Sequence, residues 1–242
     1  MNNFKHRTRR ERIWEIIIGQ TLMTLLIAVI SLYLIYYAFG YKINWNNFSF
    51  RHTGMIYLSF SPSDADVYLD GKLIAHGSSF SDNFYAGFYD VEVNKFGYNS
   101  WTTSAKITDD MVFADKSITL FRSSAKISDV SDTGTIASID SPNDSLISNP
   151  QGGLSANSYE IWNGENLVTR FSSPITGVIW YPGNNYIGYQ KGDEIRIIER
   201  SGTNDQLLVK LSSANPTHFL FSWDGSDLLY KDGTSYKKAS IN

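Results

Sequence analysis

The chain contains no cysteine among its 242 residues. Disulfide frameworks, cysteine-ligated zinc sites and thiol nucleophiles are therefore excluded, and a bacterial surface fits this composition better than a eukaryotic extracellular setting. Clustered positive charge is also lacking beyond residue 12. Residues 1–12 hold five basic side chains against one acidic one, whereas the whole chain has a net charge of −3. The acidic remainder argues against a nucleic-acid partner, because phosphate neutralisation needs clustered Lys and Arg.

Charged side chains are missing altogether from Ile16 to Phe39. A helix needs about 20 apolar residues to cross a hydrocarbon core of about 30 Å. We therefore predict a transmembrane helix over residues 13–40, behind a basic cytoplasmic tail formed by residues 1–12. Positive flanks stay in the cytoplasm, so the predicted location is the cell membrane, in a single pass, with the C-terminal regions outside. Aromatic residues, which favour membrane–water boundaries, gather at the outer end of the span: Tyr33, Tyr36, Tyr37, Phe39, Tyr41 and Trp45.

A cleaved signal peptide is the main alternative to this membrane anchor. The apolar core of a signal peptide runs for about 7–15 residues and is followed by small residues at the cleavage site. The apolar run of this chain is longer, and aromatic rather than small residues follow it. The sequence therefore favours an uncleaved helix that has membrane lipid as its partner.

After a juxtamembrane segment over residues 41–52, residues 53–122 alternate between apolar and polar side chains, with Gly and Asp at the turns. Such alternation indicates strands that have one buried and one solvent-exposed face. Short strands with no helix between them predict a small β-sandwich. The expected strands are Met55–Phe60, Ala65–Leu69, Phe88–Asn94, Trp101–Lys106 and Lys116–Phe121.

Two segments of this region resemble the PEGA domain family. Ser61–Lys72 (SPSDADVYLDGK) resembles the opening of that domain, in which a Pro-led turn precedes an apolar strand and Asp-Gly-Lys. Ala86–Tyr98, which ends in Phe-Gly-Tyr, resembles its second signature. The departure is Ser63-Asp64, which stands where the family has Glu-Gly. The resemblance implies an extracytoplasmic β-sandwich of bacterial cell surfaces and no catalytic chemistry.

Residues 123–242 contain an internal repeat. The segment 139–147 is matched by 180–188 and again by 221–229, each time as an apolar strand end, a polar turn and another strand. Units of about 40 residues with four strands have the size of propeller blades. The turns resemble those of WD-repeat and TolB-like propellers. We therefore predict blade-like units near 136–173, 174–213 and 216–242, and a fold that is mainly β overall.

The number of repeats leaves three alternatives open. Closed propellers usually have at least four blades, and open sheet edges invite pairing with another chain. The chain is then a truncated propeller protein, an open array that closes by oligomerisation, or an ordinary sandwich.

Metal and catalytic chemistry find little support in the sequence. The four histidines are scattered, and a metal site needs convergent ligands: His6, His52, His76 and His218. Three aspartates that approach a calcium-loop pattern lack the remaining ligands and are expected in a surface turn: Asp64, Asp66 and Asp70. The carboxylate pairs Asp109-Asp110 and Asp193-Glu194 could in principle serve a glycosidase, but both lie at apparent turns, where solvated charge is the ordinary explanation. We therefore predict no catalytic residue, no metal and no cofactor.

Four tryptophans recur with the strands and are expected in the core rather than on a sugar or protein surface: Trp101, Trp162, Trp180 and Trp223. The predicted function is a non-catalytic, membrane-anchored extracytoplasmic binding or adhesion module for a protein or an envelope polysaccharide. The alternative is a structural subunit of an envelope complex whose open repeats are completed by a partner or a second copy. A membrane-tethered hydrolase is the third and weakest hypothesis, and the sequence singles out no ligand-binding residue.

Overall fold

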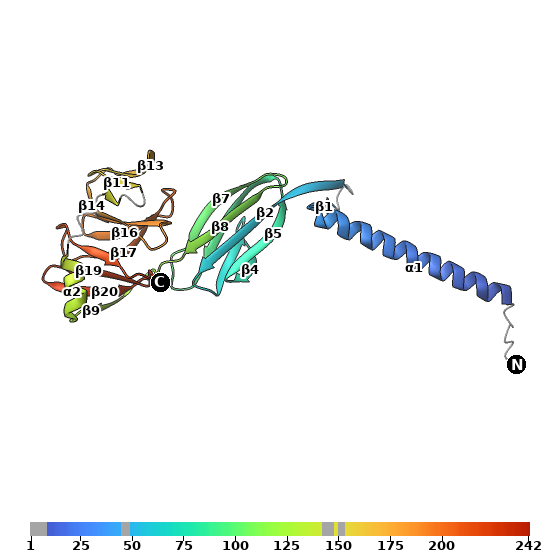
Figure 1. Cartoon of the computed structure of the whole chain (residues 1–242), viewed down its shortest axis with the longest axis horizontal. Coiled ribbons are helices and arrows are strands. Elements are labelled where there is room, and N and C mark those ends of the chain that lie inside the picture. Colours follow the sequence, from blue (N-terminus) through green and yellow to red (C-terminus); the bar gives the residue numbers. More distant parts are fainter. Residues whose placement is uncertain (1–8, 45–48, 142–147, 150–152) are drawn as a thin grey trace. The chain divides into compact units, whose positions relative to one another are not determined.

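The computed structural model of the chain describes residues 9–44, 49–141, 148–149 and 153–242. These residues form two helices and twenty strands (Figure 1), and none of the sheets closes into a barrel. The prediction of a mainly β chain with one N-terminal apolar helix is confirmed. Of the residues discussed above, His6, Trp45 and the segment 142–147 lie outside the described residues.

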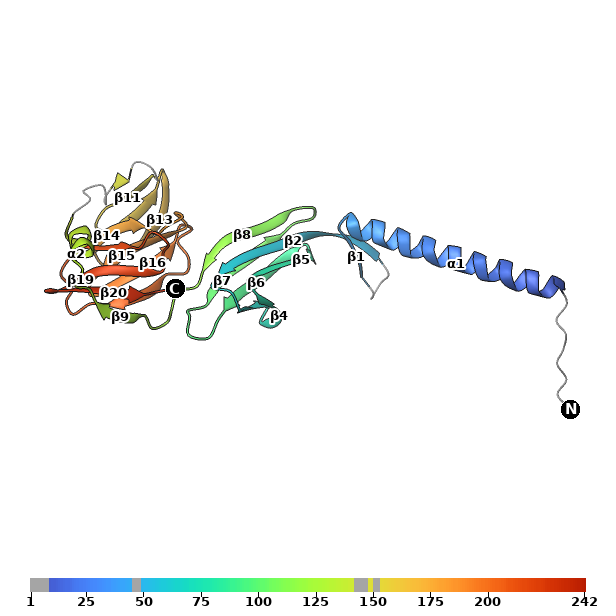
Figure 2. The ribbon, with the colours of Figure 1, turned by 60° about the horizontal axis from the view of Figure 1, so that its bottom comes forward.

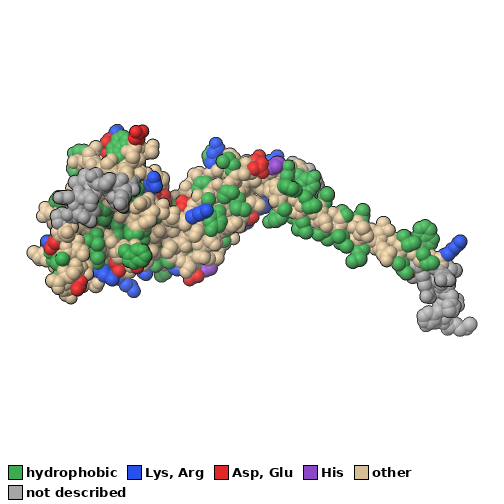
Figure 3. All heavy atoms as spheres, viewed as in Figure 1, with side chains coloured by type: hydrophobic (Ala, Val, Ile, Leu, Met, Phe, Trp, Pro, Cys, Tyr) green, Lys and Arg blue, Asp and Glu red, His purple; other side chains and the backbone are tan. Residues whose placement is uncertain are grey.

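The first helix, α1 (Arg9–Ala38), contains the apolar stretch. Its part Ile13–Ala38 is long and apolar enough to cross a membrane, and none of it is buried against the rest of the chain. A signal sequence near the N-terminus has the same two properties. The hydroxyls of Thr21 and Thr24 donate to the carbonyls of Ile17 and Gln20, at 2.8 and 2.9 Å, so they need no outside partner. Figure 3 shows apolar side chains along the surface of α1.

The chain divides into two compact units. We call the first the helix unit; it contains the described part of Met1–Ile56 together with Asp82–Phe88 and Lys106–Phe113. The second, the body unit, contains Tyr57–Ser81, Tyr89–Ala105 and Ala114–Asn242. Each contact described below lies within one of these units.

Eight strands precede residue 120 and form two four-stranded sheets. In one sheet the order is β1-β2-β5, and β8 also pairs with β2. In the other sheet the order is β4-β3-β6-β7. Their bounds are β1 (Tyr41–Asn44), β2 (Ser49–Ser61), β3 (Ala65–Leu69), β4 (Lys72–Gly77), β5 (Ser79–Tyr85), β6 (Gly87–Asn94), β7 (Trp101–Ile107) and β8 (Val112–Thr119). The expected strand Ala65–Leu69 is found with the same bounds and buries every second side chain. Strands β4 and β5 were not predicted, because both are largely exposed and show no apolar alternation.

Twelve strands follow and form three four-stranded antiparallel sheets, to which we refer as the first, middle and third sheets. The first sheet contains β10 (Ser148–Asn149), β11 (Leu154–Ala156), β12 (Glu160–Asn163) and β13 (Asn166–Arg170). The middle sheet contains β14 (Ile175–Trp180), β15 (Tyr186–Lys191), β16 (Glu194–Glu199) and β17 (Gln206–Lys210). The third sheet contains β18 (Phe219–Phe221), β19 (Asp227–Asp232), β20 (Ser235–Ser240) and β9 (Lys126–Asp129).

The third sheet takes its fourth strand from the beginning of the repeat region. Strand β9 pairs antiparallel with β20, with Ile127 opposite Ala239, although more than a hundred residues separate them (Figure 2). One core cluster joins the middle and third sheets through residues such as Ile197 and Tyr230. A second cluster joins the first and middle sheets through residues such as Ile161 and Ile187. The middle sheet therefore has both of its faces covered.

The first copy of the sequence repeat was predicted wrongly. Ile139 and Asp140 were expected at a strand end, but they close the second helix, α2 (Thr133–Asp140). The carboxylate of Asp132 explains the helix start, since it accepts hydrogen bonds of 2.8 Å from both the backbone N–H and the hydroxyl of Thr135. Side-chain caps of this kind stabilise a helix by about 1 kcal/mol. The other two copies, 180–188 and 221–229, are the expected strand–turn–strand segments.

Candidate functional site

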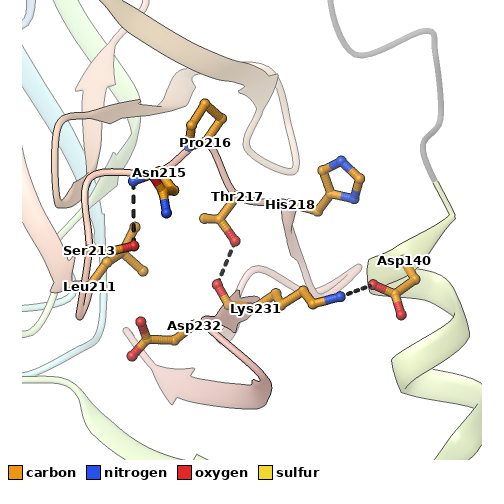
Figure 4. Close-up of a pocket in the computed structure, with 10 residues that line it drawn as sticks. Asp140, Leu211, Ser213, Asn215, Pro216, Thr217, His218, Lys231 and Asp232 are labelled. Atoms are coloured by element: carbon orange, nitrogen blue, oxygen red, sulfur yellow. Dashed lines mark hydrogen bonds and ion pairs between the residues drawn. The ribbon is translucent and has the colours of Figure 1, made fainter.

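A polar cavity of about 350 Å³ lies beside the third sheet (Figure 4). It is lined by Asp140, Leu211, Ser213, Asn215, Pro216, Thr217, His218, Lys231, Asp232 and Gly233. The buried side chain of Gln190 holds the loop that forms one wall. Its amide donates to the carbonyls of Gly192 and Asn215, at 2.8 and 2.9 Å, and its oxygen accepts from the backbone N–H of Thr217 at 2.8 Å.

One side of this cavity carries a lysine–aspartate pair. The Nζ atom of Lys231 lies 3.0 Å from Oδ1 of Asp140 (Figure 4). The hydroxyl of Tyr236 donates to the same carboxylate. The hydrogen bonds from Tyr236 and Lys231 lower the pKa of Asp140. Hydrogen bonds with Tyr236 and with Asp140 raise the pKa of Lys231. The pair is therefore ionised at neutral pH and largely compensates its own charge.

The second carboxylate of the cavity, Asp232, is paired as well. Burial alone would raise its pKa, but hydrogen bonds from Lys237 at 2.6 Å and from the hydroxyl and N–H of Ser212 outweigh burial and lower the pKa to about 2. Both carboxylates are thus paired with lysines. The lining also contains the exposed ring of His218, for which no hydrogen bond or ion pair to another described residue is found. The cavity suits a small polar ligand rather than a strongly charged one.

A second cavity, of about 330 Å³, lies beside the turn between β18 and β19. The described residues that line it are Ser59, Phe60, Ser61, Lys116, Ser117, Ile118, Thr119, Tyr181, Pro182, Asn185, Tyr186, Asp224 and Asn242. In the adjoining turn the carboxylate of Asp224 accepts from the hydroxyl of Ser222 at 2.7 Å and from the backbone N–H of Ser226 at 3.1 Å. These hydrogen bonds lower the pKa of Asp224. The same turn presents the indole of Trp223, which is 93% exposed.

Gly225 brings the turn between β18 and β19 into close contact with Tyr181, which follows β14 of the middle sheet. Its φ of +75° lies in the left-handed region that favours glycine. A Cβ atom at this position would lie 2.2 Å from the hydroxyl oxygen of Tyr181, which itself donates to the carbonyl of Gly225 at 3.0 Å. The turn is therefore held from two sides, and Trp223 projects from a fixed base.

Within the body unit, three residues before the repeats are bonded to the middle sheet or its turns: Trp101, Thr102 and Thr119. The indole N–H of buried Trp101 donates to the carboxylate of Glu199. The backbone N–H and C=O of Thr102 both bond the side-chain amide of Asn204, each at 3.1 Å. The N–H of Thr119 donates to the hydroxyl of Tyr186 at 2.9 Å. These bonds fix β7 and the end of β8 against the repeats.

His52 and His76 each lie beside a different aspartate. The Nδ1 atom of His52 lies 3.0 Å from Asp110, and that of His76 lies 2.8 Å from Asp66. Among the described residues, no three His, Cys, Asp or Glu side chains come close enough together to hold a metal ion. Of the three aspartates expected in a surface turn, Asp64 and Asp70 lie at turns, with φ values of +63° and +49°. The prediction was wrong for Asp66, which lies in strand β3.

Of the two carboxylate pairs, Asp109, Asp110 and Asp193 lie at turns, whereas Glu194 is the first residue of β16. Asp193 follows Gly192 in the turn between β15 and β16 and lies 3.4 Å from Lys210, while Glu194 lies 2.8 Å from Arg196. Asp110 has a φ of +60° in the turn between β7 and β8. Each of these three carboxylates has a basic or histidine partner, and no pair faces one of the cavities described above.

The tryptophans divide into two groups. Trp101 is 2% exposed, as the prediction of a core residue requires. Trp162 and Trp180 are half-buried, and Trp223 is almost wholly exposed, so the core prediction was wrong for Trp223. The signal that could have identified it is local, because it is followed directly by Asp-Gly, a turn sequence that places its neighbours on the surface.

Comparisons with known proteins add no functional information. No protein-family model matches the chain, and no curated protein matches it. One solved structure, a DUF3823 family protein from Bacteroides ovatus ATCC 8483, aligns with 78% of this chain and 97% of its own at 10% identity and a TM-score of 0.21. A TM-score this low supports no inference about fold or function. The resemblances to PEGA domains and to propellers therefore stay predictions.

Proposed function

We propose that this chain is a single-pass membrane protein whose β regions lie outside the cytoplasm and bind a protein or an envelope polysaccharide without catalysis. The observation that carries the proposal is α1, in which none of the apolar residues from Ile13 to Ala38 is buried against the rest of the chain. Exposed apolar surface is unfavourable in water by roughly 25 cal/mol per Å². A helix of this kind is therefore stable in a bilayer.

The residues on either side of the helix support the orientation. Arg9, Arg10 and Arg12 lie in the first turn of α1, and Tyr33, Tyr36 and Tyr37 lie in its last turns. Positive residues favour the cytoplasmic side, and tyrosines favour the boundary between membrane and water. This arrangement supports a cytoplasmic N-terminus and extracytoplasmic β regions.

The binding surface that we favour contains Trp223 and the cavity beside it. Exposed tryptophans stack on sugar rings and serve as anchor residues in protein interfaces. The neighbouring cavity adds side chains that form hydrogen bonds, such as Asn185 and Asn242. A fixed aromatic surface beside polar groups suits an uncharged or weakly charged polysaccharide.

The membrane part of the proposal is tested by fractionation of cells that produce the full chain. We expect the protein to resist extraction with carbonate, to float with membranes and to keep its N-terminal residues. A soluble product that begins after Phe39 would identify α1 as a cleaved signal sequence and contradict an anchor.

The binding part is tested with Trp223→Ala, using Phe96→Ala as the matched control. Both side chains are aromatic, belong to the body unit and are nearly fully exposed, at 93% and 101%. We expect retention by envelope polysaccharide to fall about tenfold with Trp223→Ala, equivalent to the loss of about 1.4 kcal/mol at an anchor residue, and to be unchanged with Phe96→Ala. Equal retention of both variants would exclude this surface.

A second candidate function, a structural subunit completed by a second copy, is favoured by the first sheet. Ile161 faces the core, whereas the paired residues Trp162 and Leu167 point to the opposite face of the sheet, where no described cluster covers them. Exposed apolar rows invite association. The full chain in detergent would then form a concentration-dependent dimer that Leu167→Glu abolishes; a monomer at all concentrations would exclude this function.

A further inference from the structure

The C-terminal end of α1 is attached to the first β hairpin within the helix unit. The carbonyl of Gly40 accepts hydrogen bonds from both the backbone N–H and the hydroxyl of Thr53, at 3.0 and 2.6 Å. The ring of Tyr36 packs 5.6 Å from that of Tyr41 and 5.0 Å from that of Phe50. The β1–β2 hairpin therefore lies against the last turns of the helix (Figure 1).

The turn between β7 and β8 joins the same attachment point. The N–H of Asp110 donates to the carbonyl of Thr53 at 3.2 Å, and the N–H of Met55 donates to the carbonyl of Met111 at 2.9 Å. Thr53 thus bonds the end of the helix on one side and this turn on the other. Two hydrogen-bond steps separate Asp110 from Gly40.

The close approach of the β7–β8 turn to strand β2 depends on Gly54. A Cβ atom at this position would lie 2.3 Å from the carbonyl oxygen of Thr108 and 2.8 Å from that of Met111. Backbone atoms cannot yield as a flexible side chain can, so any larger residue would displace the turn. The sequence places a glycine where the turn and β2 come into contact.

A histidine connects the two elements through its side chain. The ring of His52 packs 3.9 Å from that of Tyr41, the first residue of β1, and its Nδ1 atom lies 3.0 Å from Oδ1 of Asp110. The aromatic rings of the helix end and the hairpin therefore form one continuous contact, which His52 extends to Asp110 of the turn.

Three apolar side chains stay exposed around this attachment point: Phe50 at 48%, Met111 at 63% and Val112 at 59%. We call them the helix-end surface. Met111 follows the two aspartates of the turn between β7 and β8, and Val112 is the first residue of β8. Polar residues are usual at such a turn. Apolar residues at a turn tip beside a membrane-spanning helix suit the boundary between headgroups and acyl chains.

We infer that the helix-end surface rests in the interfacial layer of the same bilayer that α1 crosses. The sheet that contains β1 and β2 is then held against the lipid surface at two points rather than at one. The inference rests on the proposed function, because it needs α1 to span the membrane. The charges around this surface are of both signs, Lys42 and Arg51 against Asp82 and Asp110, and Nζ of Lys42 lies 3.2 Å from Oδ1 of Asp82. Insertion therefore depends on apolar contact and does not require anionic lipid.

Because the chain has no cysteine, a single introduced thiol reports on one site. The full chain with Met111→Cys, labelled with an environment-sensitive fluorophore, is reconstituted into phosphatidylcholine vesicles. We expect nitroxide-bearing lipids to quench the label and aqueous iodide to quench it at least fivefold less than the same label at Phe96→Cys. The control side chain is fully exposed and belongs to the body unit. A label at Val112→Cys should behave as the one at position 111 does.

Flotation of the same vesicles separates this inference from the proposed function. If the protein floats but the labels at positions 111 and 112 are as accessible to iodide as the control, the interfacial contact is wrong and the anchor stands. If the protein does not float, the anchor and the interfacial contact are both wrong. Quenching that requires phosphatidylglycerol would also overturn the inference, since it would show that charge rather than apolar contact drives the association.

Discussion

The middle and first sheets of the repeat region have the same strand number but different burial. In the middle sheet, all five residues from Tyr186 to Gln190 of β15 are buried. In the first sheet, the strand β13 (Asn166–Arg170) has no buried residue. The middle sheet lies between two core clusters, whereas the first sheet contributes to one.

The difference shows where the stability of the array is concentrated. A strand covered on both faces reads as a continuous apolar run, and a strand covered on one face alternates. Ile195 and Ile197 of the middle sheet face the cluster shared with the third sheet, while Ile198 faces the cluster shared with the first. We therefore expect the middle sheet to determine the stability of the array, and the first sheet to tolerate change.

The largest expected effect comes from removing a side chain of the middle sheet. Ile197 is 0% exposed, so Ile197→Ala should lower the free energy of unfolding of the full chain in detergent by about 2–5 kcal/mol. The matched change in the first sheet, Leu167→Ala at a side chain 42% exposed, should lower it by less than about 1 kcal/mol. Denaturant titration followed by circular dichroism measures both, and equal losses would refute the comparison.

A smaller loss is expected at the end of β16. The carboxylate of Glu199 accepts hydrogen bonds from Trp101 and, at 2.6 and 3.1 Å, from Thr203 and Asn204. Hydrogen bonds to a charged group contribute about 1.5–3 kcal/mol, so Glu199→Ala should lower the free energy of unfolding by about 2–3 kcal/mol. Glu165→Ala, at an exposed turn of the first sheet, serves as control. An equal, small effect of both variants would show that Glu199 does not stabilise the junction.

The close packing of the middle sheet on the third sheet depends on Gly188. A Cβ atom there would lie 2.7 Å from the ring of Phe221 and 3.3 Å from that of Phe219. Gly188→Ala should destabilise by about 1–3 kcal/mol through overpacking. Phe221→Leu in the same chain should recover part of this loss, and a double-mutant cycle measures the coupling. Purely additive effects of the two substitutions would contradict direct contact.

The smallest effect concerns the pH dependence of the third sheet. The pKa of Asp232 in the folded chain, about 2, lies below the value near 3.9 of an unfolded chain. Its ion pair therefore stabilises the fold above about pH 5, and this contribution is lost as the pH falls towards 2. Asp232→Asn should cost about 1–2 kcal/mol at pH 6. The difference from the parent chain should disappear near pH 2, and a difference independent of pH would contradict the ion pair.

The sequence allowed the prediction of elements whose apolar pattern is strong. Ala65–Leu69 is a strand with the predicted bounds, and 180–188 is the predicted strand–turn–strand segment. The weak elements could not be predicted, because their structure depends on distant residues or on local caps. Strand β9 is fully exposed and is held by pairing with β20, and α2 begins at a single aspartate cap.

The candidate sites were less accessible to prediction. The sequence named no binding residue, because the cavity beside the third sheet combines Asp140 with residues more than seventy positions later. Trp223 was expected in the core on the basis of strand spacing, but its turn neighbours place it outside. The contact between Gly40, Thr53 and Asp110 likewise joins residues that no local pattern relates.

The orientation of the chain in the membrane is tested most directly by cysteine accessibility in spheroplasts. Since the parent has no cysteine, Arg10→Cys and Trp223→Cys each introduce one exposed thiol, the first before the apolar part Ile13–Ala38 of α1 and the second after it. We predict that a membrane-impermeant maleimide labels position 223 in intact spheroplasts and position 10 only after lysis. Labelling of position 10 before lysis, or of position 223 only after it, would contradict a membrane-anchored protein with extracytoplasmic β regions.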